Sequence, residues 1–231
     1  PSADDIAHRT IRKPMTAAER KQFIKQFGFA ITPIILAYAV FTIVRDFVED
    51  FANELWTETG FQNNAGVFAQ TSTTIALITL AIIAGFFLIK SNYKAFRLSH
   101  FLIMAGVLLS AISTFCFSAH FITPFTWMLL STTGLYLAYL PFNCVYFERM
   151  LATYKINGNI GFVMYIADAF GYLGTVAVLL IKEFIPIKYS WINFFSFLFY
   201  AAAALGVLLI IISLSTHSKL YKNLCNKNQP S

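Results

Sequence analysis

Long apolar runs separated by short polar links dominate the chain. Six of these runs are long enough for an α-helix to cross the hydrocarbon core of a bilayer, which takes about 20 residues. They cover residues 27–48, 67–89, 100–122, 125–147, 160–181 and 190–214. The runs lack the alternation of apolar and polar residues that a transmembrane β-barrel needs. The pattern therefore predicts an all-α, polytopic membrane protein with six transmembrane helices.

The polar ends of the chain flank this bundle. We expect residues 1–26 to form a cytoplasmic linker, residues 27–215 the six-helix transmembrane bundle and residues 216–231 a cytoplasmic tail. Within the linker, Thr16 and Glu19 have the spacing of a capping box, in which each side chain accepts a hydrogen bond from the backbone N–H of the other residue. The basic and apolar residues that follow predict a short amphipathic helix at the lipid headgroups, with a solvated linker as the alternative.

Composition narrows the functional classes. The chain is 58% apolar and 12% charged, whereas a soluble domain carries about 25% charged residues. These values exclude a disordered chain, a nucleic-acid-binding domain and an ordinary water-soluble enzyme. The sequence has no motif of a serine hydrolase or zinc protease, and His8, His100 and His217 lie outside or at the very edge of the predicted spans. We therefore expect neither an enzyme nor a bound metal or cofactor, and no nucleic-acid partner.

The basic residues predict the orientation of the bundle. If residues 1–26 are inside, 14 of the 17 Lys and Arg residues fall on the inner side, as the positive-inside rule requires. The acidic residues show the opposite bias, because most of those around the spans fall on or near the outer side. We therefore expect both termini to be cytoplasmic.

Polar residues recur on one side of three predicted spans. They are separated by three or four residues, which places them on one face of a helix. Such a face is expected to point into the protein because lipid offers no hydrogen bonds. Pro141 predicts a kink within the fourth span. The candidate cavity-lining residues are Tyr38, Thr42, Arg45 and Asp46 in the first span, Thr132, Tyr136, Tyr139, Asn143, Tyr146, Glu148 and Arg149 in the fourth, and Tyr165, Asp168 and Tyr172 in the fifth.

Two interpretations of these residues remain open. Tyr, Ser and Thr side chains often hydrogen-bond between transmembrane helices, so each is either a ligand contact or a contact between helices. Asp168 lies near the bilayer centre, where an aspartate costs about 3 kcal/mol on translocon scales. It is either a proton, ion or substrate site, or a structural group that is protonated or bonded to a neighbour. The pairs Arg45–Asp46 and Glu148–Arg149 are either substrate contacts or ion pairs that anchor or gate the helices.

The first and fourth spans share a proline, a stripe containing tyrosine and a terminal pair of acidic and basic residues. They run in opposite directions, so the chain divides into two three-helix units of opposite topology. A 3+3 inverted repeat of this kind occurs within each half of a major-facilitator transporter. It predicts that the first and fourth helices face each other and line one cavity. The small residues within 171–174 and 201–206 predict close helix packing.

Three stretches carry a resemblance to a known family. They are residues 45–56 (RDFVEDFANELW), 140–150 (LPFNCVYFERM) and 158–174 (GNIGFVMYIADAFGYLG). Together they resemble an uncharacterised bacterial family within the major-facilitator superfamily. The resemblance implies that the chain is the C-terminal six-helix half of a twelve-helix protein in the bacterial inner membrane. Residues 1–26 would then end the linker between the two halves.

This resemblance implies a secondary transporter, or its C-terminal half, that moves a small solute by alternating access. Arg45 and Arg149 suit an anionic or carboxylated solute, and coupling to a proton or to sodium is left open. The expected partners are the lipid bilayer, a small solute, and either the N-terminal half or a second copy of the chain. The alternative is a standalone six-helix module without transport activity, such as a dimer, a sensor or an assembly factor.

Overall fold

A computed structural model describes residues 15–62, 65–154, 159–184 and 190–227 of the chain. Every element within these ranges is helical, and six helical segments are long and apolar enough to cross a membrane. The prediction of an all-α, multi-pass membrane protein is therefore confirmed. The long helices are α2 (Ala17–Asp50), α4 (Ala65–Gly85), α5 (Asn92–Ser118), α6 (Pro124–Pro141), α8 (Ile160–Phe184) and α9 (Trp191–Lys227).

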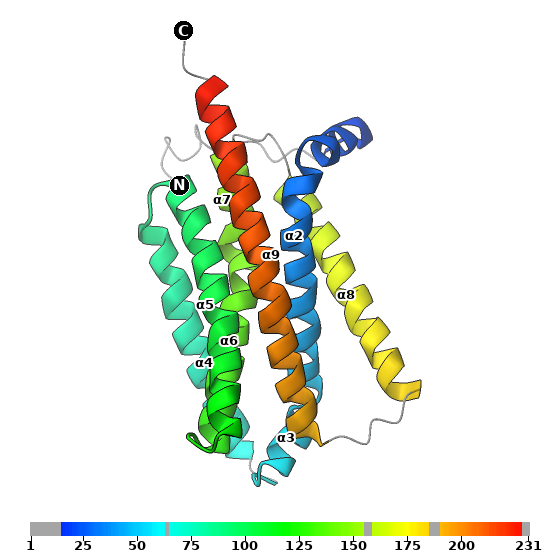
Figure 1. Cartoon of the computed structure of the whole chain (residues 1–231), viewed down its shortest axis with the longest axis vertical. Coiled ribbons are helices and arrows are strands. Elements are labelled where there is room, and N and C mark those ends of the chain that lie inside the picture. Colours follow the sequence, from blue (N-terminus) through cyan, green and yellow to red (C-terminus); the bar gives the residue numbers. More distant parts are fainter. Residues whose placement is uncertain (1–14, 63–64, 155–158, 185–189, 228–231) are drawn as a thin grey trace.

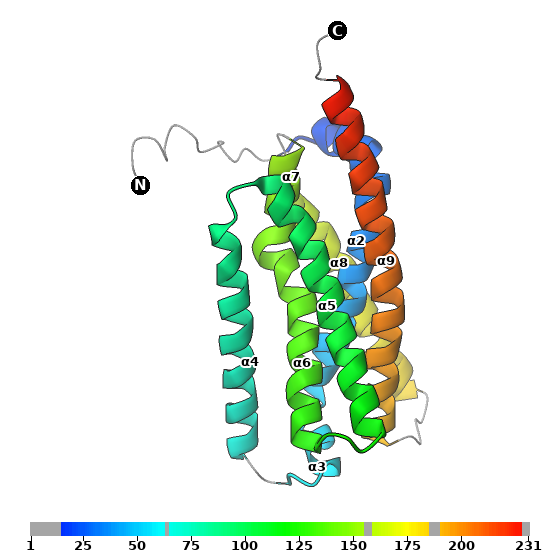
Figure 2. The ribbon, with the colours of Figure 1, turned by 60° about the vertical axis from the view of Figure 1, so that its left-hand side comes forward.

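Shorter elements complete an elongated bundle. Helix α3 (Ala52–Glu58) follows α2, and the 3₁₀ turn η1 (Phe86–Leu88) ends the second span. The fourth span combines α6, the π-helical segment η2 (Phe142–Tyr146) and α7 (Phe147–Thr153). The first and fourth spans are the most buried. Helices α4 and α8 are the least buried and lie at opposite edges of the bundle in Figure 1. In Figure 2, α4 stands at one edge and α8 lies behind the other helices.

Small residues let neighbouring helices touch. A Cβ atom on Gly106 of α5 would lie 2.5 Å from the carbonyl oxygen of Gly134 on α6, so the two backbones meet at this crossing. Ser110 uses the close approach to donate its hydroxyl to the carbonyl oxygen of Ser131, 2.7 Å away on α6. The predicted sites of close packing are confirmed as well, since three of their glycines contact side chains of α2: Gly171 with Thr42, Gly174 with Ile43, and Gly206 with Phe41.

The capping box at the start of α2 is confirmed. The Thr16 hydroxyl accepts from the Glu19 N–H at 3.3 Å, and the Glu19 carboxylate accepts from the Thr16 N–H at 2.7 Å. The helix that follows is amphipathic: Phe23 packs against the ring of Phe162, whereas Lys21 is exposed. This segment is therefore a helix continuous with the first span rather than a solvated linker.

The last span is longer than its apolar run. Helix α9 continues past Ser215, where the predicted bundle ends, and runs to Lys227. Part of the predicted tail, residues 216–227, is therefore helical. Several predictions fall outside the described residues: residues 1–14 of the linker, Lys155 and Lys188 of the predicted loops, and residues 228–231 of the tail.

Candidate functional site

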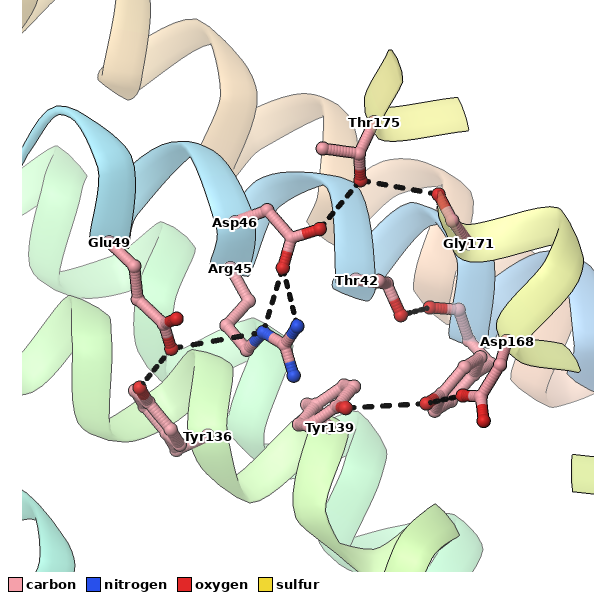
Figure 3. A network of polar contacts seen from close by, with 10 residues as sticks. Thr42, Arg45, Asp46, Glu49, Tyr136, Tyr139, Asp168, Gly171 and Thr175 are labelled. Carbon is pink, nitrogen blue, oxygen red and sulfur yellow. Dashed lines mark hydrogen bonds and ion pairs between the residues drawn. The ribbon is translucent and has the colours of Figure 1, made fainter. Parts of the chain in front are cut away.

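Three side chains from three helices meet inside the bundle. Tyr38 of α2 donates its hydroxyl proton to Asp168 of α8, with 2.5 Å between the two oxygens. The hydroxyls of Tyr38 and Tyr139 of α6 lie 3.3 Å apart, and their rings stack with centroids separated by 5.3 Å. Because the Tyr38 proton is directed at Asp168, Tyr139 is the donor in this second bond. Thr42, one turn further along α2, donates to the Tyr38 carbonyl oxygen at 2.9 Å and so stays within its own helix (Figure 3).

Arg45 lies two turns beyond Tyr38 and is surrounded by partners. Its Nε donates to Asp46 at 3.0 Å and lies 3.8 Å from the carboxylate of Glu49. The guanidinium carbon lies 4.2 Å from the centre of the Tyr139 ring, which is a cation–π distance. Asp46 also accepts from the hydroxyl of Thr175 at 2.7 Å. A polar network therefore joins α2, α6 and α8 (Figure 3).

This network carries more negative than positive charge. Arg45 is its basic residue, and Asp46, Glu49 and Asp168 are its carboxylates. Asp46 and Glu49 both lie within ion-pair distance of Arg45, whereas no basic side chain in the described part of the chain lies within that distance of Asp168. Asp168 is half-buried, and its polar contact in the network is the Tyr38 hydroxyl. It is therefore the carboxylate of this network that Arg45 does not pair with.

A cavity of about 630 Å³ lies beside the network, within the range of about 300–1,000 Å³ typical of small-ligand sites. Tyr136 donates to Glu49 in its wall, and Thr132 lies one turn away on α6. Helix α4 supplies the opposite wall, where Thr71 and Thr79 donate their hydroxyls to carbonyls of their own helix. Glu49 is the one charged residue among the described residues of the lining, which otherwise includes Trp56, Phe68, Ile75 and Met128.

The predicted polar stripe of the fourth span does not stay on one face. The π-helical segment after Pro141 closes its hydrogen bonds from residue i to i+5 and so holds an extra residue per turn, which rotates the following side chains relative to α6. Asn143 is exposed and lines a separate cavity of about 180 Å³. Tyr146 is fully buried on the side that contacts α5 and α9. The expectation that these two residues share a face with Thr132 and Tyr139 is therefore corrected.

Four further candidates lie outside the network. Glu148 is exposed and lines the same small cavity as Asn143. Arg149 donates to the side chain of Asn92 at 2.7 Å and forms no ion pair with Glu148 within the described residues. Tyr165 and Tyr172 are 77% and 56% exposed. Among the polar side chains of α8, Asp168 and Thr175 instead form hydrogen bonds with side chains of α2.

Sequence reasoning missed a second polar cluster, between α5, α9 and the π-helical end of the fourth span. Nε2 of His100 lies 3.0 Å from the Tyr146 hydroxyl and 3.1 Å from that of Ser213. Nδ1 of His217 lies 2.8 Å from the Tyr154 hydroxyl. Both imidazoles are buried, although they lie at or beyond the ends of the predicted spans, because α5 and α9 extend beyond the apolar runs. The four-residue spacing of Ser213 and His217 is the signal that could have revealed this shared face.

Comparison with curated proteins and with solved structures gives no significant match. A family profile, in contrast, matches residues 1–219. The match spans most of the chain and includes every residue of the polar network. The chain therefore belongs to DUF5690, a family of unknown function.

Proposed function

We propose that this chain is the C-terminal half of a secondary transporter that moves a small solute by alternating access, and that Asp168 couples transport to a proton or a cation. The observation that carries the proposal is the contact of Asp168 with Tyr38, without a basic partner among the described residues. Carboxylates inside the membrane are costly and are typical of ion pathways and proton relays. An asparagine could accept the same hydrogen bond without the charge, so a purely structural role gives no reason for an acid.

The cavity beside the network supports a solute site that communicates with Asp168. A solute that competes for the bond between Tyr136 and Glu49 also changes the environment of Arg45, because Glu49 lies 3.8 Å from the Arg45 Nε. Arg45 rests on the ring of Tyr139, whose hydroxyl is linked to Asp168 through one further tyrosine. Occupancy of the cavity and the charge of Asp168 are thereby connected through contacts between neighbouring side chains.

The charges favour a cationic solute, or one rich in hydrogen-bond donors, over the anionic solute expected from the sequence. Arg45 already lies within ion-pair distance of two carboxylates, and Arg149 is bonded to Asn92 away from the large cavity. Glu49, in contrast, is the charged group in the described lining of that cavity. A solute entering there meets a carboxylate rather than a free guanidinium.

The open edges of the bundle are assigned to the other half of the transporter. Helices α4 and α8 are the least buried spans, and α4 forms one wall of the large cavity. A second six-helix bundle placed against these edges would close the cavity on its outer side. The N-terminal half of the same protein or a second copy of this chain could supply that bundle.

Ligand-induced thermal stabilisation of the chain in detergent tests the solute site. We expect at least one member of a panel of polyamines, amino acids, carboxylates and sugars to raise the Tm. Glu49→Gln should weaken the apparent affinity about tenfold, the typical effect of losing one charge-assisted hydrogen bond. Asp50→Asn is the matched control, because Asp50 is an exposed carboxylate on the same helix that lines none of the described cavities.

Repeating the binding measurement across a pH series tests the coupling role. If Asp168 exchanges a proton when the solute binds, the affinity depends on pH in the wild-type chain, and Asp168→Asn removes that dependence while solute binding persists. An affinity unchanged by Glu49→Gln, or a pH profile unchanged by Asp168→Asn, would contradict the proposal. A panel in which nothing stabilises the chain would favour the standalone six-helix module instead.

A further inference from the structure

A groove separate from the polar network lies between the start of α2 and the start of α8. Its volume is about 350 Å³. Both helices begin at the same end of the bundle, where the first turns of α2, dark blue in Figure 1, bend away from the bundle axis. The groove is lined by Met15 and Arg20 on the side of α2, and by Asn159, Phe162, Tyr165, Ile166 and Ala169 on the side of α8.

Arg20 is held so that its terminal nitrogens stay available. Its Nε donates to the carbonyl oxygen of Met15 at 3.0 Å, and its guanidinium carbon lies 5.5 Å from the centre of the Phe162 ring. These two contacts fix the plane of the guanidinium, and no acceptor among the described residues engages the two Nη groups. A guanidinium fixed in this way matches the geometry of a phosphate, which it binds through two parallel N–H donors.

The surroundings of Arg20 favour an anion. Lys21 and Lys25 are exposed on the same helical segment, and the one acid there, Glu19, is turned back onto Thr16 in the capping box. The first two turns of α8, residues 160–167, contain no charged residue. Asn159 uses its side-chain oxygen to accept from the N–H of Gly161 at 2.9 Å, so its amide nitrogen remains as a further donor.

The apolar part of the lining points to a lipid rather than a free anion. Phe162, Ile166 and Ala169 follow α8 into the membrane-spanning part of the chain, and this helix is the least buried of the six spans. On α2, Phe29 is 85% exposed close to the basic residues. Basic side chains beside exposed apolar ones are typical of a helix that lies at the membrane interface.

We propose that this groove binds an anionic phospholipid, with the headgroup phosphate on Arg20 and one acyl chain along Ile166 and Ala169. The bound lipid would contact both helices and so stabilise the packing of the first turns of α2 against α8. The inference does not depend on the transport proposal, because none of these residues belongs to the polar network or to the large cavity.

Titration of the purified chain in detergent with phosphatidylglycerol, monitored by native mass spectrometry, tests the site. Phosphatidylcholine of the same acyl length and inorganic phosphate are titrated in parallel to separate the contributions of charge, chain and free anion. We expect phosphatidylglycerol to bind at least about tenfold more tightly than either, and Arg20→Gln to remove about tenfold of that affinity. Arg97→Gln is the matched control, since Arg97 is an exposed arginine near the start of α5 that also lies over an aromatic ring, that of Tyr93.

A second variant tests the acyl-chain part of the groove. Ala169→Phe fills the groove while all basic residues remain, so it should weaken the binding of phosphatidylglycerol as Arg20→Gln does. Equal losses for Arg20→Gln and Arg97→Gln would show attraction to general surface charge and would overturn the proposal. Equal affinities for the two lipids, tight binding of phosphate alone, or no effect of Ala169→Phe would overturn it as well.

Discussion

A single methyl group at the crossing of α5 and α6 should destabilise the bundle. The Cβ of Gly106→Ala would lie 2.5 Å from the Gly134 carbonyl oxygen and 2.7 Å from the backbone nitrogen of Ala138. Both neighbours are backbone atoms, so neither can move aside by changing a rotamer. Ordinary contacts of a Cβ atom begin near 3.4 Å. The two helices must therefore separate by up to about 0.9 Å before an alanine fits.

The cost of this separation follows from the contacts that it weakens. A gap of 0.5–1 Å forfeits about a quarter to a half of each dispersion well, so a patch of roughly 50 atom contacts loses about 2–4 kcal/mol. Replacing a helical glycine by alanine returns up to about 1 kcal/mol of helix propensity. The net loss in unfolding free energy is then about 1–3 kcal/mol, which lowers the Tm by roughly 5 °C for a chain of this length.

Thermal unfolding in detergent measures this loss as a decrease in the Tm. Gly85→Ala is the matched control: it adds the same methyl group to a helix, but the new Cβ meets no atom within 4 Å. We expect its Tm to equal or slightly exceed that of the wild type. If Gly106→Ala has the same Tm as Gly85→Ala, the two backbones do not touch at this crossing, and the expected destabilisation is refuted.

Three further variants, two of them paired with a control variant, probe other contacts. Ser110→Ala should lower the unfolding free energy by about 0.6–1 kcal/mol because it removes a hydrogen bond between helices, whereas Ser118→Ala, whose hydroxyl bonds within its own helix, should not. Thr16→Ala removes the capping box and should cost about 1 kcal/mol, seen as faster hydrogen exchange in the first turns of α2. His100→Asn should lower the unfolding free energy, measured by SDS denaturation, by about 2 kcal/mol, because it leaves buried hydroxyls poorly hydrogen-bonded. His120→Asn is its control and should leave the unfolding free energy unchanged. His120 is exposed and has a left-handed backbone conformation that asparagine also adopts.

Periodicity identified a large part of the candidate site. Five of its residues are polar positions that recur at helical spacing within apolar runs, and the structure joins them in one network. They are Tyr38, Arg45, Tyr136, Tyr139 and Asp168. The physical reason is strong: hydrocarbon cannot satisfy hydrogen bonds, so polar groups inside a span collect on the side that faces protein. The capping box was predictable for a similar reason, since both of its hydrogen bonds join residues three apart.

Periodicity in the sequence does not predict the position of a side chain where that position depends on a neighbouring helix. The π-helical segment turned Asn143 and Tyr146 away from Tyr139, although their spacing in the sequence is regular. On α8, Tyr165 and Tyr172 share the stripe of Asp168 and yet remain mostly exposed. Both differences arise because spacing assigns a residue to a face of its own helix and does not say which part of that face meets another helix.

The sequence by itself determined the six spans, the capping box and the polar positions that gather in the network. Tertiary structure alone decided that α4 forms a wall of the large cavity, that His100 and His217 lie in one buried cluster, and that Arg20 lies over a groove next to α8. Lipid tails are as apolar as the inside of a helical bundle. An apolar side chain is therefore about equally stable facing lipid or facing protein, and only the packing of the helices decides which of the two it faces.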